Sequence, residues 1–293
     1  MNAKTVELIG SYWTLAGGAY PHTDREYSPW DFRERVEAAA RVGFTGLGIW
    51  HSDLIHVLKK RSLREMKKIL EDNGITHIEL EFIFDWFLEG EKKKKSDELR
   101  NLLLTAAEVM RANHVKVGDF FNTPCPMPKL VESFAELCED AEDYGTKIAF
   151  EMMPFANVHT LEDTLALVEG AGANGGIILD LWHIVRMGIP YEELKRIPIS
   201  RLIGVELNDG DMKVEGDLHL ATINNRKLCG EGEFDVRGFI QCLFDMGYRG
   251  AWGIEVLNAE MREWPMDRLF TESYQTTIAQ FKNIRMPAGA GRK

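Results

Sequence analysis

The sequence predicts a single (β/α)8 barrel, and three observations lead to this fold class. Eight short apolar runs rich in β-branched residues alternate with eight segments of helical periodicity along the 293 residues. The apolar runs, such as Gly-Ile-Ile-Leu and Leu-Ile-Gly-Val, are continuous, which is typical of strands buried on both faces of a parallel sheet. Eight β/α units in about 250–290 residues match a closed barrel. We expect the barrel to span residues 1–286 and a flexible tail to follow at 287–293.

The elements follow one another in strict alternation. We expect strands at 6–13, 46–50, 77–83, 114–118, 147–152, 176–181, 202–207 and 251–256. We expect helices at 31–41, 62–73, 96–112, 129–144, 161–170, 191–196, 236–246 and 266–283, of which 191–196 is short. Thr160 begins a capping-box-like start with Asp163 at the third position, and Gly247 follows a helix as C-cap glycines do.

The main rival is a doubly wound open sheet, which would need a glycine-rich phosphate loop after an early strand. The stretch Ala16-Gly17-Gly18 is too short to be one. A long connection follows the seventh strand, from residue 209 to about 234. Loops of that size in compact domains are usually functional or disordered. We expect this loop to fold over the barrel mouth, or alternatively to form a dimer contact.

Composition restricts the partners. The chain has 35 basic and 46 acidic residues, a formal charge of −11, so its average surface repels nucleic acid and anionic membranes. No apolar run reaches the roughly 18 residues of a membrane span, and the N-terminus lacks a signal-peptide core. Four cysteines without a CxxC pair fit neither a zinc ribbon nor a disulfide framework. We expect a cytoplasmic protein that acts on small molecules.

The last four strands each carry a carboxylate within or just after an apolar run: Glu151, Asp180, Glu206 and Glu255. The C-terminal ends of barrel strands converge on one mouth, where these groups would repel unless protonated or bound to a cation. A divalent metal resolves the repulsion, and oxygen ligands favour Mg²⁺ or Mn²⁺ over zinc. The alternative stays open that some of them form structural ion pairs with Lys116, Arg186 or Arg226.

Several motifs in this order resemble the xylose isomerase-like TIM-barrel superfamily. They are Glu151, Asp180-x-x-His183, Glu206-x-Asn208-Asp209, Gly230-Glu-Gly232 and Gly-Tyr-x-Gly-x-x-x-Ile-Glu255. The superfamily contains ketose 3-epimerases, hydroxypyruvate isomerase, inosose dehydratase and endonuclease IV-type enzymes. The resemblance runs from residue 13 to about 281. The extra histidine ligands of the nucleases are missing, and the acidic composition also argues against DNA.

The resemblance implies site residues position by position. Glu151, Asp180 and Glu255 match three metal ligands, whereas Glu206 stands where the epimerases usually have a histidine. This departure leaves open whether Glu206 binds a metal directly. His183 matches a residue that touches the substrate or lies beside the metal. Arg226 resembles an arginine that reaches sugar hydroxyls.

Three further residues are candidate substrate contacts. Asn208 belongs to the strand-seven motif, and Trp13 and His51 lie at the predicted ends of the first two strands. Aromatic side chains at such a rim suit the faces of sugars. Asp217 and His219 in the long loop form an alternative, weaker metal-binding pair. His114 begins a strand, on the face associated with stability, and we expect it to be structural.

These residues together suggest an enzyme that moves a proton next to a carbonyl. A divalent ion would stabilise the enediolate while Glu151 and Glu255 remove and return the proton. We therefore expect isomerisation or epimerisation of a small keto-sugar or keto-polyol. The alternatives are elimination from a keto-inositol or a 3-keto-glycoside, including C-glycoside cleavage, and a non-catalytic sugar-binding barrel. A homo-oligomer, dimer or tetramer, is compatible with the sequence.

Overall fold

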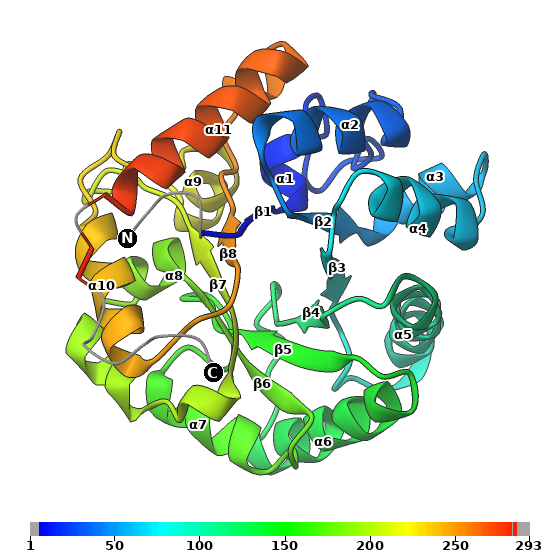
Figure 1. Cartoon of the computed structure of the whole chain (residues 1–293). Helices are drawn as coiled ribbons and strands as arrows, with labels where there is room; N and C mark the ends of the chain where they lie inside the picture. Colours follow the sequence, from blue (N-terminus) through cyan, green and yellow to red (C-terminus); the bar gives the residue numbers. More distant parts are fainter. Residues whose placement is uncertain (1–5, 283, 286–293) are drawn as a thin grey trace.

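The computed structural model describes residues 6–282 and 284–285, and it confirms the predicted fold class. Eight parallel strands form a closed barrel in sequence order (Figure 1). They are β1 (Leu8–Gly10), β2 (Gly46–Trp50), β3 (His77–Ile83), β4 (His114–Val117), β5 (Lys147–Glu151), β6 (Gly175–Asp180), β7 (Leu202–Leu207) and β8 (Trp252–Ile254). The barrel closes through parallel pairing of β1 with β8.

Helices between successive strands surround this barrel (Figure 1). The longer ones are α2 (Phe32–Val42), α4 (Leu63–Asp72), α5 (Gly90–Met110), α6 (Met127–Asp143), α7 (Leu161–Glu169), α10 (Val236–Met246) and α11 (Met266–Gln280). The predicted helix at 191–196 is the 3-10 helix η2 (Tyr191–Arg196). Two shorter 3-10 turns, η3 (Ile199–Arg201) and η4 (Met261–Glu263), complete the connections.

Four short helices near the C-terminal ends of strands were not predicted: α1 (Tyr12–Leu15), α3 (His51–Leu58), α8 (Leu181–Arg186) and α9 (Leu218–Asn224). The predicted first strand was therefore too long, because β1 ends at Gly10 and the chain turns into α1. The stretch 209–234 is not one open loop, since it contains α9 and pairs Asp209 with Lys227. The predicted tail at 287–293 lies outside the described residues.

Local signals explain where the helices begin and end. Ser62 and Glu65 form a capping box at the start of α4, and the Thr160 side chain accepts from the Asp163 N–H as the sequence predicted. Gly247 ends α10 in the left-handed region at φ 97°, which a residue without Cβ adopts readily. Helix α5 begins at Gly90, earlier than predicted, and therefore includes the lysine run 92–95.

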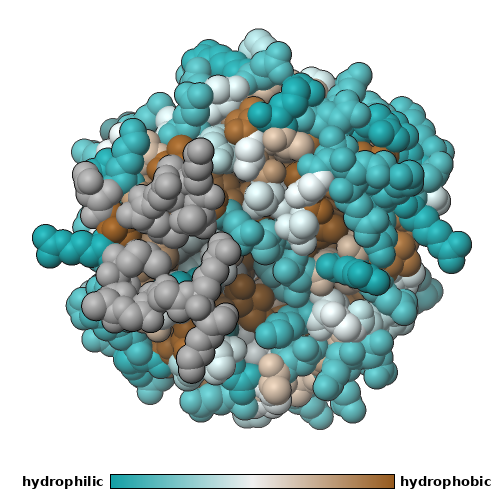
Figure 2. Space-filling model, viewed as in Figure 1, coloured by the Kyte–Doolittle hydropathy of each residue, from teal (hydrophilic) through white to brown (hydrophobic). Residues whose placement is uncertain are grey.

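The outside of the molecule is polar. Charged and polar side chains dominate the helix exteriors, and hydrophobic residues show mainly between the helices (Figure 2). Beneath them, outward-facing strand residues such as Val115, Val117 and Phe150 pack into the main hydrophobic core. No helix within the described residues is both long enough and apolar enough to cross a membrane.

The interior of the barrel, in contrast, is filled by charged side chains at the level of the strand ends. Glu79, Glu81 and Lys116 are each 1% exposed and lie on β3 and β4. Barrel interiors usually hold branched aliphatic residues in this position. Gly253 on β8 makes room for one of the acidic chains, since a Cβ there would lie 2.9 Å from the Cγ of Glu206.

Candidate active site

The four carboxylates predicted from the last four strands lie together at the barrel mouth. Glu151 ends β5, Asp180 ends β6, Glu206 lies in β7, and Glu255 directly follows β8. One oxygen of each lies within 4.8 Å of the others. All four side chains are buried, and Glu206 is 0% exposed. The barrel thus concentrates negative charge in a region with little water, where it requires compensation.

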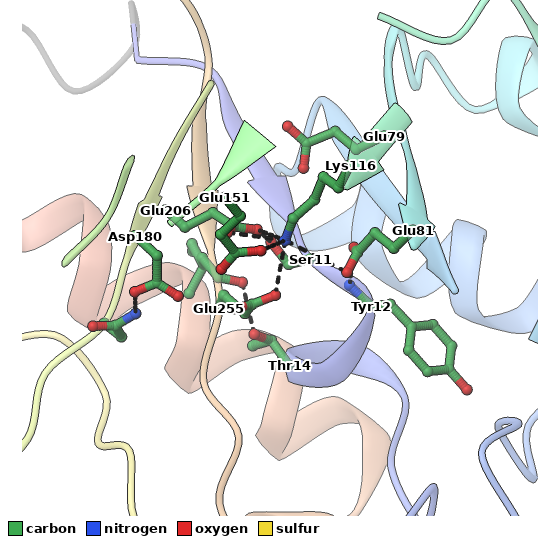
Figure 3. A network of polar contacts seen from close by, with 12 residues as sticks. Ser11, Tyr12, Thr14, Glu79, Glu81, Lys116, Glu151, Asp180, Glu206 and Glu255 are labelled. Atoms are coloured by element: carbon green, nitrogen blue, oxygen red, sulfur yellow. Dashed lines mark hydrogen bonds and ion pairs between the residues drawn. The ribbon is translucent and has the colours of Figure 1, made fainter. Parts of the chain in front are cut away.

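Lys116 of β4 provides the central compensation. Its Nζ donates to both oxygens of Glu206 at 2.8 and 3.0 Å and to Oε1 of Glu255 at 3.1 Å. It also lies 3.4 Å from Glu151 Oε2 and 3.6 Å from Glu81 Oε2. Figure 3 shows the dashed contacts converging on this nitrogen, with Glu81 on the opposite side from the other three carboxylates.

The sequence interpretation treated Lys116 only as an alternative ion-pair partner and missed Glu81. A signal for both was available. Strand β3 reads Glu-Leu-Glu and β4 reads His-Val-Lys, so charged or polar residues recur at every second position within apolar strands. Residues two apart in a strand point to the same face. Applying the criterion used for the last four strands to β3 and β4 would have placed both residues in the barrel.

Arg226 is the second cation of the cluster. It follows α9 and is 2% exposed. Its Nη1 donates to Asp180 Oδ2 at 2.5 Å and to Glu255 Oε2 at 3.0 Å, while Nε donates to the Thr222 carbonyl oxygen. The connection after β7 therefore does bring Arg226 to the mouth, where it pairs with acidic neighbours.

These contacts bear on whether the carboxylates fit a metal ion. Their number, oxygen chemistry and proximity suit a divalent cation. However, Asp180 Oδ1 already accepts from the Trp182 N–H and from Asn208 Nδ2, both at 2.7 Å, and Oδ2 accepts from Arg226. Glu206 Oε1 accepts from Ser11 Oγ at 3.0 Å in addition to Lys116. The four carboxylates therefore suit a metal ion. A metal ion from solution would, however, have to compete for their oxygens with the side chains of Lys116 and Arg226.

A pocket opens above this cluster. Its aromatic lining consists of Trp13, Trp50, Phe82, Phe120 and Phe155, and its charged or titratable lining includes Glu81, Lys116, Glu151, His183, Arg226 and Glu255. Asp180 and Glu206 are not part of the lining, because Arg226 and Lys116 lie against them, and Asn208 is not part of it either. The predicted substrate contact Asn208 instead donates to Asp180.

The two remaining aromatic candidates differ in position. Trp13 lines the pocket and packs on Trp50 with ring centroids 5.0 Å apart. His51 does not line it, and its ring packs against Trp50 and Phe84. Burial lowers the pKa of His51 to about 4, so this side chain is neutral near pH 7. His51 is therefore placed as a packing residue behind the aromatic rim.

The two candidate acid–base residues have opposite pKa displacements. Burial opposes ionisation of Glu151, but Lys116 and His183 hold its pKa below the ordinary value. Burial raises the pKa of Glu255 well above the ordinary range, and Lys116 and Arg226 only partly offset it. His183 Nε2 lies 3.3 Å from Glu151 Oε1. The surroundings thus displace the pKa values of these two carboxyl groups on the pocket wall in opposite directions.

Asp217 and His219, which the sequence offered as a possible clip for a second metal ion, each have another partner in the structure. Asp217 accepts from the Leu220 N–H and caps α9. His219 instead places its Nε2 3.0 Å from Nε2 of His22, and both imidazoles line the pocket entrance. Among the described residues, the groups that could hold a metal ion include neither Asp217 nor His219.

Two curated relatives resemble the chain in sequence. Inosose isomerase of Halalkalibacterium halodurans is 25% identical over 253 residues, covering 83% of this chain and 89% of that protein. A 3-dehydroshikimate dehydratase of Pseudomonas aeruginosa is 27% identical over 244 residues, covering 79% of this chain. This chain spans only 37% of the length of that dehydratase.

Solved structures share the fold. The IOLI protein with a bound zinc atom superposes with a TM-score of 0.82 at 19% identity, covering 96% of this chain and 99% of that chain. D-psicose 3-epimerase from Clostridium cellulolyticum superposes with a TM-score of 0.70 at 17% identity, covering 94% and 98%. The model of the Xylose isomerase-like TIM barrel family matches residues 36–277. The chain belongs to the Xylose isomerase-like TIM barrel family.

Proposed function

We propose that the chain is an isomerase or epimerase of a small keto-sugar or keto-polyol and that it works through an enediolate. The observation that carries this proposal is the pair Glu151 and Glu255. Both line one pocket, and both lie against Lys116, at 3.4 and 3.1 Å, yet their pKa values are displaced in opposite directions. Proton transfer next to a carbonyl requires a base and an acid with different pKa values, and the surroundings of Glu151 and Glu255 create this difference.

The reaction begins with Glu151. Its carboxylate takes the proton from the carbon next to the substrate carbonyl, and the C–H electron pair moves to form the enediolate. Negative charge then develops on the carbonyl oxygen, beside the positive charges of Lys116 and Arg226 on the pocket wall. The protonated Glu255 returns a proton to carbon.

The place of that second protonation decides the product. Protonation of the former carbonyl carbon, with the hydroxyl proton passing from the adjacent oxygen to the former carbonyl oxygen, gives isomerisation. Protonation of the original carbon on its other face gives epimerisation. If Glu255 instead protonates a β-hydroxyl as it leaves, the result is dehydration. The dehydratase relative supports this alternative, and a larger β-substituent would give lyase chemistry on a 3-keto-glycoside.

The substrate class follows from the lining. The aromatic rim around Trp13 and Trp50 suits the carbon face of a polyol, and His183 and Arg226 offer donors to its hydroxyls. The inosose isomerase relative, of which the chain covers 89%, supports a cyclic keto-polyol. The sequence predicted Mn²⁺ or Mg²⁺ from the oxygen ligands; an ion held by Glu151, Asp180, Glu206 and Glu255 would supply Lewis-acid stabilisation of the enediolate.

The experiment is an NMR screen for deuterium uptake in D₂O with keto-sugars, keto-inositols and 3-keto-glucosides. We expect uptake at the carbon next to the carbonyl of at least one compound, whichever product follows. Glu139→Gln on the exposed face of α6 serves as the control variant. Binding of a ketone without any uptake would overturn the proposal and favour the non-catalytic sugar-binding barrel.

A further inference from the structure

We infer that the ammonium group of Lys116 is the resident cation of this site and takes the place of a divalent metal ion. The binding part of this inference rests on the contacts of Lys116 alone. Its catalytic part, that Lys116 stabilises the enediolate, rests on the proposed function. Metal-binding measurements test the first part, and deuterium uptake in the presence of EDTA tests the second.

The nitrogen of Lys116 is surrounded by as many ligands as a bound cation would have. An ammonium has three N–H donors. All three are used, because Nζ donates to both oxygens of Glu206 and to Oε1 of Glu255. Glu151 and Glu81 add two more carboxylates within 3.4 and 3.6 Å. One positive charge surrounded by four carboxylates has the environment that a bound cation would have.

Lys116 lies deep inside the barrel. Its side chain is 1% exposed, although lysine is almost never fully buried without partners. Removing such an ammonium from water costs several kcal/mol, which only closely placed opposite charges offset. Lys116 therefore depends on the carboxyl groups around it, since without them its charge would be buried without a partner.

Few carboxylate oxygens of the cluster are left for a metal ion. Both oxygens of Glu206 are hydrogen-bonded to Lys116, and both oxygens of Asp180 accept from Arg226, Trp182 or Asn208. A divalent ion at the four carboxylates would have to displace these donors. It would then share the same small volume with two positive charges of the chain.

Lys116 is also placed to act on a substrate. It lines the pocket together with Glu151 and Glu255. When a ketone binds, its oxygen accepts the N–H that Glu255 accepts in the free protein. This exchange places the ammonium on the oxygen where charge develops and frees Glu255 to protonate carbon.

The test begins with the unaltered protein. After treatment with EDTA and dialysis, metal content is measured by elemental analysis, and binding of MnCl₂, MgCl₂ and ZnCl₂ by calorimetry. We expect less than about 0.1 ion per chain and no saturable binding of one ion at micromolar concentration. Saturable binding of one ion per chain at micromolar concentration would overturn the inference.

The second measurement uses Lys116→Met, which removes the charge and keeps the length of the side chain. With the carboxylates uncompensated, we expect this variant to bind Mn²⁺ or Zn²⁺ at least about 10-fold more tightly than the unaltered protein. Lys147→Met, at the exposed start of β5, is the matched control and should bind no better than the unaltered protein. If Lys116→Met does not fold, metal content and metal binding of the unaltered protein still show whether the site holds a metal ion.

Deuterium uptake in the presence of EDTA separates this inference from the proposed function. Deuterium uptake that persists without metal supports both the proposed function and the catalytic role of Lys116. Uptake that appears only with added Mn²⁺ or Mg²⁺ overturns the role of Lys116 and leaves the proposed function standing. Absence of uptake with every ketone, in a protein that also binds no ion, contradicts the proposed function while the binding part of the inference holds.

Discussion

His183 Nε2 lies 3.3 Å from Oε1 of Glu151, and the other oxygen of this carboxylate lies 3.4 Å from Lys116 Nζ. His183 belongs to α8, which directly follows β6, so the contact joins two successive β/α units. Because donors approach both oxygens, the carboxylate of Glu151 is held in one orientation at the pocket wall. A fixed orientation of the base is the condition for efficient proton abstraction.

Replacing the base should abolish most of the activity. We expect Glu151→Gln to lower the rate of deuterium uptake at least about 100-fold, since an amide of the same shape cannot accept the proton. The measurement is the NMR uptake rate with the best ketone substrate. The exposed variant Glu139→Gln should retain the unaltered rate. A Glu151→Gln protein with normal uptake would move the role of base to another residue.

The pH dependence of uptake should be bell-shaped. Activity should fall at acid pH as Glu151, whose pKa is below the ordinary value, takes up a proton. It should fall at alkaline pH as Glu255, whose pKa burial raises well above the ordinary range, loses its proton. Glu255→Gln should lower the activity at every pH, because an amide cannot return the proton. An alkaline limb that survives in this variant would assign the acid elsewhere.

Arg226 should be needed for stability as well as for activity. Arg226→Ala leaves Asp180 buried without its cation, so we expect the free energy of unfolding to fall by about 3–5 kcal/mol. Adding Asp180→Asn should restore part of this loss. Urea unfolding of the two single variants and the double variant gives the coupling energy.

The neighbouring surface pair provides the matched control. Lys227 and Asp211 are 2.6 Å apart but 35% and 54% exposed. Lys227→Ala should therefore cost about 1 kcal/mol or less. If Arg226→Ala and Lys227→Ala lowered the free energy of unfolding equally, burial of the Arg226–Asp180 pair would add nothing to stability.

Glu79 should make stability depend on pH. Burial raises its pKa to about 8, with Lys116 partly opposing, and His114 lies 3.4 Å away. Between the ordinary pKa of 4.5 and about 8, the folded chain keeps a proton that the unfolded chain has released. Stability therefore falls as pH rises through this window, by up to about 1.4 kcal/mol per pH unit.

Glu79→Gln stays neutral and should flatten this part of the curve. Urea unfolding across the window gives the slopes of the two proteins, with the exposed Glu142→Gln as the control. Identical slopes for Glu79→Gln and the unaltered protein would show that Glu79 is ionised in the folded state.

The strands were predictable because each is an apolar run of a few residues between helical segments. The short helices α1 and α8 were not, because four and six residues are too few to show helical periodicity. In α8 the first turn is defined instead by Asp180, whose side chain caps it. Such caps depend on the local backbone, which an apolar pattern does not reveal.

The carboxylates of the site were predictable from their place at the ends of the last four strands. The pairing of Glu206 with Lys116 was not, because it joins residues 90 positions apart in the sequence. Lysine and arginine side chains reach several neighbours, so the sequence left Lys116, Arg186 and Arg226 open as partners. Arg186 in fact donates to the carbonyl oxygens of Asp211 and Met212, outside the cluster.

The ammonium of Lys116 also bears on the order in which the chain assembles. Its partners lie on β3, β5 and β7 and directly after β8, so they come from both halves of the sequence. A chain that has folded only its first four strands would offer this charge only the acidic residues of β3, Glu79 and Glu81. Such a half-barrel is disfavoured, and the lysine becomes stable only when the final strand closes the ring. Closure of the barrel and formation of the charged centre are therefore one cooperative event, dominated by contacts between distant parts of the chain.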